Sequence, residues 1–380
     1  MIILEKPYIS DFLIETIKKN NFRVLKSDIS KQYLDEKYLI SDEIALENLK
    51  NGDKIYSNSE NSINWICSKL PNSNLSDMIK ISKDKALFRE KIKSIYPNYY
   101  FKKVSFNELK NLETDKIPYP VVLKPAIGFL SFGVYPIKNS LEWIGTVEKL
   151  DCEIEKFKGI FPKNVVNCDN FIIEKMIEGD EFALDAYFDK NSSATILNIF
   201  QHPFFNDKDV SDRAYFTSAE IIKKYHDKFK NVLDKIGTVA GYKNFPFHLE
   251  LRVNENEIIP IELNPMRFCG WCITDIAYFA YNINPYEYYM NSLKPDWDKI
   301  LVNKNDIYYF TMADIPNSIN KKAIKNVNYA SYLKNIQNQL EIRKIDFNNN
   351  PVFAIVFAKT PDLKEIKNIL KLDMTQFIEM

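Results

Sequence analysis

The stretch FHLELRVNENEIIPIELNPMR, residues 247–267, decides the fold class of this 380-residue chain. It contains two runs of strand-forming residues, 247–253 and 259–264, separated by a polar turn over 254–258. On each run, polar side chains that carry oxygen or nitrogen ligands alternate with apolar ones. Because successive residues of a strand point to opposite faces, the pattern predicts an antiparallel hairpin with one core face and one polar face.

The polar face of this hairpin predicts a metal site. A register that pairs Glu250 with Glu262 also pairs His248 with Asn264, and like charges directly opposite in a sheet are unfavourable without a counter-ion. Two carboxylates and an amide carbonyl are hard oxygen ligands that suit Mg²⁺. The alternative is a solvated acidic face that is screened by Arg252.

A second cluster has the pattern of a phosphate site. A strand over 121–123 ends in Lys124 and leads into a loop that contains Gly128, Ser131 and Gly133. A fixed cation followed by glycines lets backbone N–H groups approach an anion closely. The alternative is a lysine that only protects a sheet edge.

A third cluster, over 171–188, is a strand that ends at Glu174, a turn and a second strand that begins at Glu181. With a period of two, Glu181 and Asp185 lie on one face of the second strand and apolar residues on the other. The face with carboxylates indicates either a functional surface or a half-solvated hairpin.

Composition excludes several classes of protein. The 51 basic and 51 acidic residues give a formal net charge of zero, which argues against nucleic-acid binding. No apolar run approaches the roughly 20 residues of a membrane span, and the first residues do not form a signal peptide, so we expect a cytoplasmic protein without membrane contact. The five cysteines include one C-x-x-C pair, Cys269 and Cys272, for which reduced thiols are favoured over a redox or zinc site.

The rest of the chain alternates strand and helix patterns. Residues 1–70 predict a small βαβ-type domain with a parallel sheet, followed by an Asn- and Ser-rich linker over 71–76 and a helix over 82–94. An apolar stripe over 221–236 predicts an amphipathic helix. Strands over 307–313 and 352–358 and a helix over 363–372 are expected near the C-terminus, for which a lid or an oligomer contact is considered.

Taken in this order, the clusters resemble the ATP-grasp superfamily over residues 83–290, in the branch that includes carboxylate-amine ligases and carbamoyl phosphate synthetase. The resemblance implies an α/β (α+β) chain that contains an ATP-grasp fold. Its expected parts are a Rossmann-like pre-ATP-grasp domain over 1–80, an ATP-grasp domain over 81–295 and a C-terminal α/β extension over 296–380. The ATP-grasp domain would divide into a small ATP-binding subdomain, 118–175, and a larger subdomain with the metal site, 176–295.

The resemblance also implies roles for individual residues. Those assigned to the phosphates are Lys85, Lys124 and the flap residues Gly128, Ser131 and Gly133. Those assigned to the nucleoside are Glu174, Lys175 and Ile177 for the adenine, with the Glu174 side chain reading the base, and Glu181 for the ribose. The metal ligands would be Glu250, Glu262 and Asn264. The candidates for holding the reacting carboxylate and its developing charge are Arg267 and Arg252. Arg213, a further catalytic candidate, and His202 lie in the segment that the fold would bring over the substrate.

The activity that the resemblance implies is an ATP-dependent ligation. A small-molecule carboxylate would be activated as an acyl phosphate and captured by an amine, with ATP and Mg²⁺ (or Mn²⁺) as cofactors. Carboxy-phosphate or carbamoyl-phosphate chemistry on bicarbonate is one alternative, and a non-catalytic nucleotide-binding regulatory protein is another. Either a monomer or a homodimer is compatible with the sequence.

Overall fold

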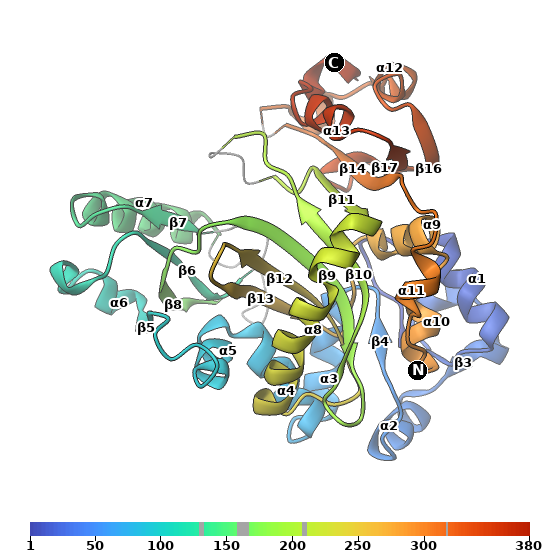
Figure 1. Cartoon of the computed structure of the whole chain (residues 1–380), viewed down its shortest axis with the longest axis horizontal. Helices are drawn as coiled ribbons and strands as arrows, with labels where there is room; N and C mark the ends of the chain where they lie inside the picture. Colours follow the sequence, from blue (N-terminus) through green and yellow to red (C-terminus); the bar gives the residue numbers. More distant parts are fainter. Residues whose placement is uncertain (129–132, 158–166, 207–210, 317) are drawn as a thin grey trace.

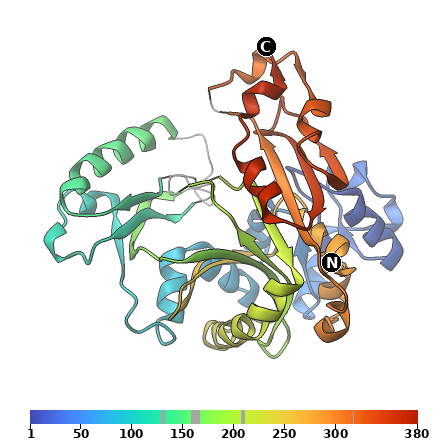
Figure 2. The same cartoon turned by 45° about the horizontal axis from the view of Figure 1, so that its top comes forward.

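The computed structural model describes residues 1–128, 133–157, 167–206, 211–316 and 318–380. Figure 1 shows three parts around one large sheet: an N-terminal unit in blue, a small lobe in cyan and green, and a C-terminal unit in red. In Figure 2 the small lobe stands apart from the C-terminal unit, on the other side of the large sheet. The architecture is mixed α/β, as the sequence predicts.

The N-terminal unit is the predicted parallel sheet with helices. Its strands follow the order β3-β2-β1-β4 and are β1 (Ile2–Ile3), β2 (Val24–Leu25), β3 (Leu39–Ile40) and β4 (Tyr56–Ser57). Its helices are α1 (Asp11–Asn20), α2 (Asp42–Lys50) and α3 (Ile63–Lys69). Ser10 caps α1, because its hydroxyl accepts the backbone N–H of Leu13 at 3.1 Å.

The prediction of a linker and one helix over 71–94 is wrong in detail. Two helices occupy this region, α4 (Asn74–Lys83) and α5 (Lys85–Ile92). Asp84 separates them because its backbone is extended and its side chain accepts the N–H groups of Ala86 and Leu87, which starts a new helix. The break places Lys85 at the first position of α5.

The small lobe has its own antiparallel sheet and core. Its strands follow the order β5-β8-β6-β7 and are β5 (Phe101–Ser105), β6 (Val121–Ile127), β7 (Tyr135–Ile137) and β8 (Asn167–Lys175). The helices α6 (Phe106–Leu109) and α7 (Leu141–Phe157) accompany it. Because β5 pairs with β8, the lobe begins before the expected residue 118.

The large sheet has the order β13-β12-β9-β10-β11-β14-β17-β16, and its pairs are antiparallel. Its first five strands along the chain are β9 (Asp180–Phe188), β10 (Ala194–His202), β11 (Ala214–Ser218), β12 (Phe245–Val253) and β13 (Ile258–Pro265). The long helix α8 (Ala219–Ala240) packs its predicted apolar stripe on one face, where Phe182 and Phe229 lie 5.6 Å apart between ring centroids. The opposite face of β9 therefore carries Glu181 and Asp185 away from this helix.

The C-terminal residues extend the large sheet instead of forming a separate sheet. Strand β14 (Ile307–Asp314) pairs with β11, and β17 (Val352–Thr360) and β16 (Asn338–Lys344) follow. Sequence analysis did not identify β10, β11 or β16 as strands. The remaining helices are α9 (Ile276–Tyr281), α10 (Pro285–Met290), α11 (Trp297–Ile300), α12 (Tyr329–Leu333) and α13 (Leu363–Leu370), and a two-stranded ribbon pairs β15 (Asn326–Val327) with β18 (Ile378–Glu379).

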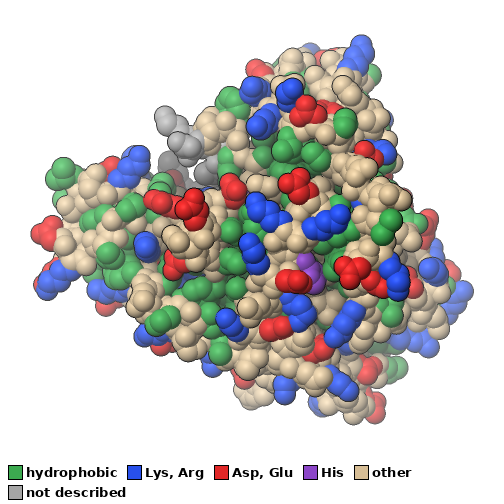
Figure 3. Space-filling model, viewed as in Figure 1, with side chains coloured by type: hydrophobic (Ala, Val, Ile, Leu, Met, Phe, Trp, Pro, Cys, Tyr) green, Lys and Arg blue, Asp and Glu red, His purple; other side chains and the backbone are tan. Residues whose placement is uncertain are grey.

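The surface agrees with the balanced charge of the sequence. Basic and acidic side chains are interspersed over the face in Figure 3. None of the described helices combines the length and the apolar character that crossing a bilayer requires.

Candidate functional site

The hairpin of β12 and β13 has the predicted register. Glu250 lies opposite Glu262, and His248 lies opposite Asn264. The predicted five-residue turn is wrong by one residue, because Val253 pairs with Ile258 and leaves a turn over 254–257. The extra residue, Ile261, is accommodated by a register shift next to the Glu250–Glu262 pair, as in a β-bulge.

The two facing carboxylates have different environments. Glu262 forms a 2.6 Å ion pair with Lys85 and accepts a hydrogen bond from Asn264 Nδ2 at 3.2 Å. Burial would raise the pKa of Glu262, but Lys85 outweighs burial and holds it well below its ordinary value. Glu250 has no ion-pair partner among the described residues, and burial followed by the charge of Glu262 raises its pKa well above the ordinary value. Among the described residues, the two carboxylates of Glu250 and Glu262 thus share a single ion-pair partner, Lys85.

A second ion cluster connects α5 to the small lobe. Glu174 on β8 contacts Lys124 Nζ at 2.5 Å and Arg89 Nε at 2.8 Å. Burial would raise the pKa of Glu174, but the two cations lower it to about 2. Lys124 lies inside β6 instead of at its end, since the strand continues to Ile127. The Glu174 side chain is thus paired with Arg89 and Lys124 in this structure, and its assignment to the adenine stays a prediction.

The backbone after Glu174 is also hydrogen-bonded. The Lys175 carbonyl accepts the hydroxyl of Tyr99 at 2.7 Å, and the Ile177 carbonyl accepts Arg252 Nη1 at 3.2 Å. Gly179 follows with φ of +108°, and a Cβ there would lie 2.1 Å from the Val253 carbonyl oxygen. Only glycine fits this turn, which keeps the β8–β9 connection close to the hairpin of β12 and β13.

Glu181 is the centre of a third cluster. It accepts hydrogen bonds from Arg252 Nε at 3.0 Å and faces His202 Nδ1 at 3.0 Å. Arg252 therefore pairs with Glu181, and not with Glu250 on its own strand. His202 is buried, stacks on Tyr215 with ring centroids 4.0 Å apart, and donates Nε2 to the Ser211 carbonyl at 3.0 Å.

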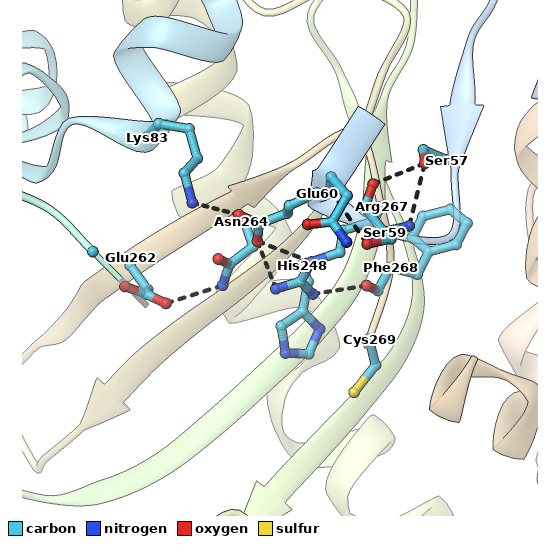
Figure 4. A network of polar contacts seen from close by, with 12 residues as sticks. Ser57, Ser59, Glu60, Lys83, His248, Glu262, Asn264, Arg267, Phe268 and Cys269 are labelled. Carbon is cyan, nitrogen blue, oxygen red and sulfur yellow. Dashed lines mark hydrogen bonds and ion pairs between the residues drawn. The ribbon is translucent and has the colours of Figure 1, made fainter. Parts of the chain in front are cut away.

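Arg267 joins the N-terminal unit to the hairpin. Its Nη2 and Nε lie 2.7 and 2.9 Å from Glu60 Oε1, and its Nη1 donates to the Phe268 carbonyl. Lys83 also contacts Glu60. Figure 4 shows this network beside Glu262 and Asn264. Burial would raise the pKa of Glu60, but Lys83 and Arg267 lower it to about 2.

Arg213 is occupied elsewhere. Its Nε donates to Asp314 at 2.9 Å, and its Nη1 donates to the carbonyls of Leu370 and Leu372. These contacts tie β11 to the C-terminal helix α13. In this structure the donors of Arg213 join two parts of the fold, and its assignment to the reacting groups stays a prediction.

Two further expectations concern the flap and the C-x-x-C pair. Lys85 Nζ donates to the Gly128 carbonyl at 3.4 Å, and Gly133 has φ of +67°, whereas Ser131 lies outside the described residues. Cys269 and Cys272 are free thiols. Burial raises the pKa of Cys272 to about 11 and that of Cys269 well above its ordinary value, so both stay protonated near neutral pH.

Comparison with known proteins agrees with this geometry. Residues 117–275 match the ATP-grasp domain family. The chain therefore contains an ATP-grasp domain. No curated protein sequence matches it significantly.

Solved structures show that the ATP-grasp fold extends over the chain. An L-amino acid ligase from Bacillus licheniformis has a TM-score of 0.68 at 14% identity and covers 99% of this chain and 97% of its own. The biotin carboxylase from Campylobacter jejuni has a TM-score of 0.65 at 14% identity over 97% of this chain and 89% of its own. The N5-carboxyaminoimidazole ribonucleotide synthetase from Thermotoga maritima has a TM-score of 0.64 at 15% identity over 100% and 98%. At these identities the likeness concerns the fold.

The donor set of this ATP-grasp protein fits a divalent cation. The described residues contain no group of three or more His, Cys, Asp or Glu side chains that could hold a metal, so the set consists of two carboxylates and the Asn264 amide. All three are oxygen ligands, and Glu250 is half-buried without an ion-pair partner among the described residues. A cation between Glu250 and Glu262 would remove their repulsion.

Three charged residues of the site were not found from the sequence. Arg89 follows Lys85 by four residues, so both lie on one side of α5, and this spacing could have indicated it. Glu60 lies in the segment SNSENS, residues 57–62, which has no distinguishing pattern. Lys83 ends a helix and looks like an ordinary C-terminal lysine.

The Glu60 network predicts a pH dependence. Because its folded pKa is about 2 and its ordinary value is 4.5, Glu60 contributes stability above pH 4.5 that is lost as the pH falls toward 2. This difference corresponds to about 3 kcal/mol at most. We expect urea unfolding of Glu60→Gln to show a shallower loss of stability over this range than the wild type.

The matched control is Glu36→Gln, since Glu36 forms an exposed ion pair with Lys26 at 2.8 Å. It should reproduce the acid slope of the wild type. An identical slope in Glu60→Gln and the wild type would contradict the role of Glu60.

Proposed function

We propose that this ATP-grasp protein is an ATP-dependent ligase that joins a carboxylate to an amine and releases ADP and phosphate. The observation that carries the proposal is the clustering of Lys85, the Glu250–Glu262 pair and Arg267, in which Lys85 pairs with Glu262 and the charge of Arg267 acts on Glu250. Each of these groups has a defined use in transferring a phosphoryl group to a carboxylate.

The residues divide into a nucleotide side and a substrate side. Lys85 and Lys124 would exchange their present carboxylate partners for phosphate oxygens, while Glu181 would hold the ribose hydroxyls. The backbone at Lys175 and Ile177 would contact the adenine. The flap residues Gly128, Ser131 and Gly133 would contact the phosphates. These assignments follow from charge and position in the ATP-grasp fold.

The metal ligands would be Glu250, Glu262 and Asn264. Bound Mg²⁺, or Mn²⁺ in its place, would supply charge neutralisation of the phosphate oxygens. Glu250 and Glu262 would then lose their mutual repulsion, and Lys85 would be free to turn toward the phosphates. The chain's own contribution is to hold these oxygens in register on two paired strands.

The substrate side begins at Arg267. Its guanidinium matches a carboxylate in two-pronged geometry, and Glu60 fixes its orientation. A substrate carboxylate oxygen would attack the γ-phosphorus as ADP leaves, which gives an acyl phosphate. An amine nitrogen would then attack the acyl carbon as phosphate leaves, with loss of one amine proton. Arg252 and His202 would act from the Glu181 cluster at the nucleotide side.

The test is an assay of ADP release with ATP and Mg²⁺, using the twenty L-amino acids singly and in pairs, and bicarbonate in a separate arm. We expect ADP release that requires an acid and an amine, with the amide detected by mass spectrometry. Release that requires only bicarbonate would favour carboxy-phosphate chemistry. ATP binding without turnover in any arm would favour a nucleotide-binding regulatory protein.

A further inference from the structure

Three polar rows cross the face of the large sheet that carries Glu181 and Asp185, and the proposed function uses only Asn264 of the third row. Directly opposed residues of paired strands lie on the same face. The first row contains Arg252, Glu181 and His202, and the second contains Glu262, Glu250 and Ala183. The third row lies two residues further along β9 and contains Asn264, His248, Asp185 and Asn198.

The third row is a built polar site. Asp185 Oδ1 lies 2.8 Å from His248 Nδ1 and accepts the backbone N–H of Cys269 at 2.7 Å. Asp185 is 0% exposed, and its Oδ2 has no hydrogen-bond partner among the described residues. Asn198, directly opposite on β10, is also fully buried and leaves its Nδ2 without a partner there.

The hydrogen bond to Asp185 determines which ring nitrogen of His248 can contact a ligand. A carboxylate oxygen only accepts hydrogen bonds, so His248 Nδ1 carries a proton and Nε2 is the ring nitrogen that remains to face a ligand. The His248 side chain keeps 6% of its surface exposed while Asp185 is sealed. No hydrogen bond to Nε2 is found within the described residues. His202 differs, because both of its ring nitrogens face oxygen atoms.

The charge of the row selects the ligand. An acceptor nitrogen backed by a sealed carboxylate favours an N–H donor or a cation over an anion. In the view of Figure 4 the His248 ring lies below the Arg267 guanidinium, with Cys269 to one side and Glu262 and Asn264 to the other. Arg267 and His248 come from the two strands and the following segment of one hairpin, so a substrate that reaches both would place its carboxylate at Arg267 and a second group at His248.

We propose that His248, held by Asp185, binds the amine substrate through Nε2 and that Asp185 is a positioning residue. The proposal rests on the proposed function and assigns the amine to the third row. It separates the site into an acid side at Arg267 and an amine side at His248, between which the C–N bond would form.

The kinetic test uses His248→Gln and Asp185→Asn in the full chain. We expect the KM for the amine to rise about 10-fold or more in His248→Gln, which is the loss of one charge-assisted hydrogen bond. Acyl phosphate formation, trapped as hydroxamate by excess hydroxylamine, and the KM for ATP should stay within about 2-fold of the wild type. Asp185→Asn should also raise the KM for the amine, but by a smaller factor than His248→Gln. Its kcat at saturating amine should change less than its KM.

The matched control is His226→Gln, because His226 lies on α8 and bonds only its neighbour Asp227 among the described residues. It should leave all constants unchanged. An unchanged KM for the amine in His248→Gln, with hydroxamate formation intact, would overturn the amine site but not the ligase. A wild-type chain that forms no hydroxamate with any amino acid would instead overturn the ligase.

A second measurement does not depend on finding the substrates. The chain has only three histidines, so long-range ¹H–¹⁵N correlation spectra of the wild type, assigned with His248→Gln, can identify the protonated nitrogen of each ring. We expect a proton on His248 Nδ1, as its hydrogen bond to Asp185 requires. A ring with a proton on Nε2 and none on Nδ1 would overturn the proposal.

Discussion

Glu262→Gln is expected to lower ATP turnover by about 100-fold or more, because it removes a proposed metal ligand and its charge. Glu262 is also the partner of Lys85 and the acceptor of Asn264. The amide keeps the size of the side chain and can still bind Asn264. The loss should therefore appear in kcat more than in folding, which a thermal unfolding curve checks.

The control for this experiment is Glu255→Gln, which alters an exposed carboxylate in the turn of the same hairpin. ADP release by that variant should equal that of the wild type. If Glu262→Gln retained full turnover, the assignment of Glu262 as a metal ligand would be wrong. If Glu262→Gln lost turnover but still bound ATP, Glu262 would be required for turnover and not for ATP binding.

Glu174→Ala is expected to destabilise the chain by about 3–5 kcal/mol, because it leaves two buried cations without their counter-charge. Lys124 and Arg89 are 7% and 2% exposed at their side chains, so water cannot replace the lost carboxylate. Both terminal nitrogens of Arg89 already lack hydrogen-bond partners among the described residues. Urea unfolding followed by tryptophan fluorescence measures the change.

Asp151→Asn provides the comparison, since Asp151 forms an exposed ion pair with Lys110 at 2.9 Å in the same lobe. That variant should stay within about 0.5 kcal/mol of the wild type. Glu174→Gln, which keeps hydrogen-bonding capacity, should fall between the two. Equal stability of Glu174→Ala and Asp151→Asn would show that the Glu174 cluster does not support the fold.

The hairpin shows what local sequence can predict. Alternation placed Glu250 and Glu262 on one face, and their register followed from two-residue periodicity. The register shift at Ile261 could not be predicted, because a shift of this kind depends on how the strand fits its neighbours and not on a local pattern. The same limit explains why β10 and β16, whose patterns are less regular, were not identified.

Side-chain partners across domains could not be predicted. Glu60 reaches Arg267 over 207 positions of sequence, and Arg213 reaches Asp314 over 101. Nothing local distinguishes an arginine that binds substrate from one that joins two strands to a helix. For Glu174, position in the chain was predicted correctly, but the direction of its side chain depends on Arg89 from another element.

The continuity of the large sheet limits how an ATP-grasp site of this kind can open. Because one hydrogen-bonded ladder runs from β13 to β16, the β12–β13 hairpin, the third polar row and the C-terminal strands form a single stiff plate. The small lobe lies outside this ladder: the chain enters it before β5 and leaves it at the turn between β8 and β9, and α5 contacts it through the Glu174 ion cluster. Nucleotide entry and product release should therefore be a swing of the small lobe, and the substrate-binding rows should keep their spacing throughout the cycle.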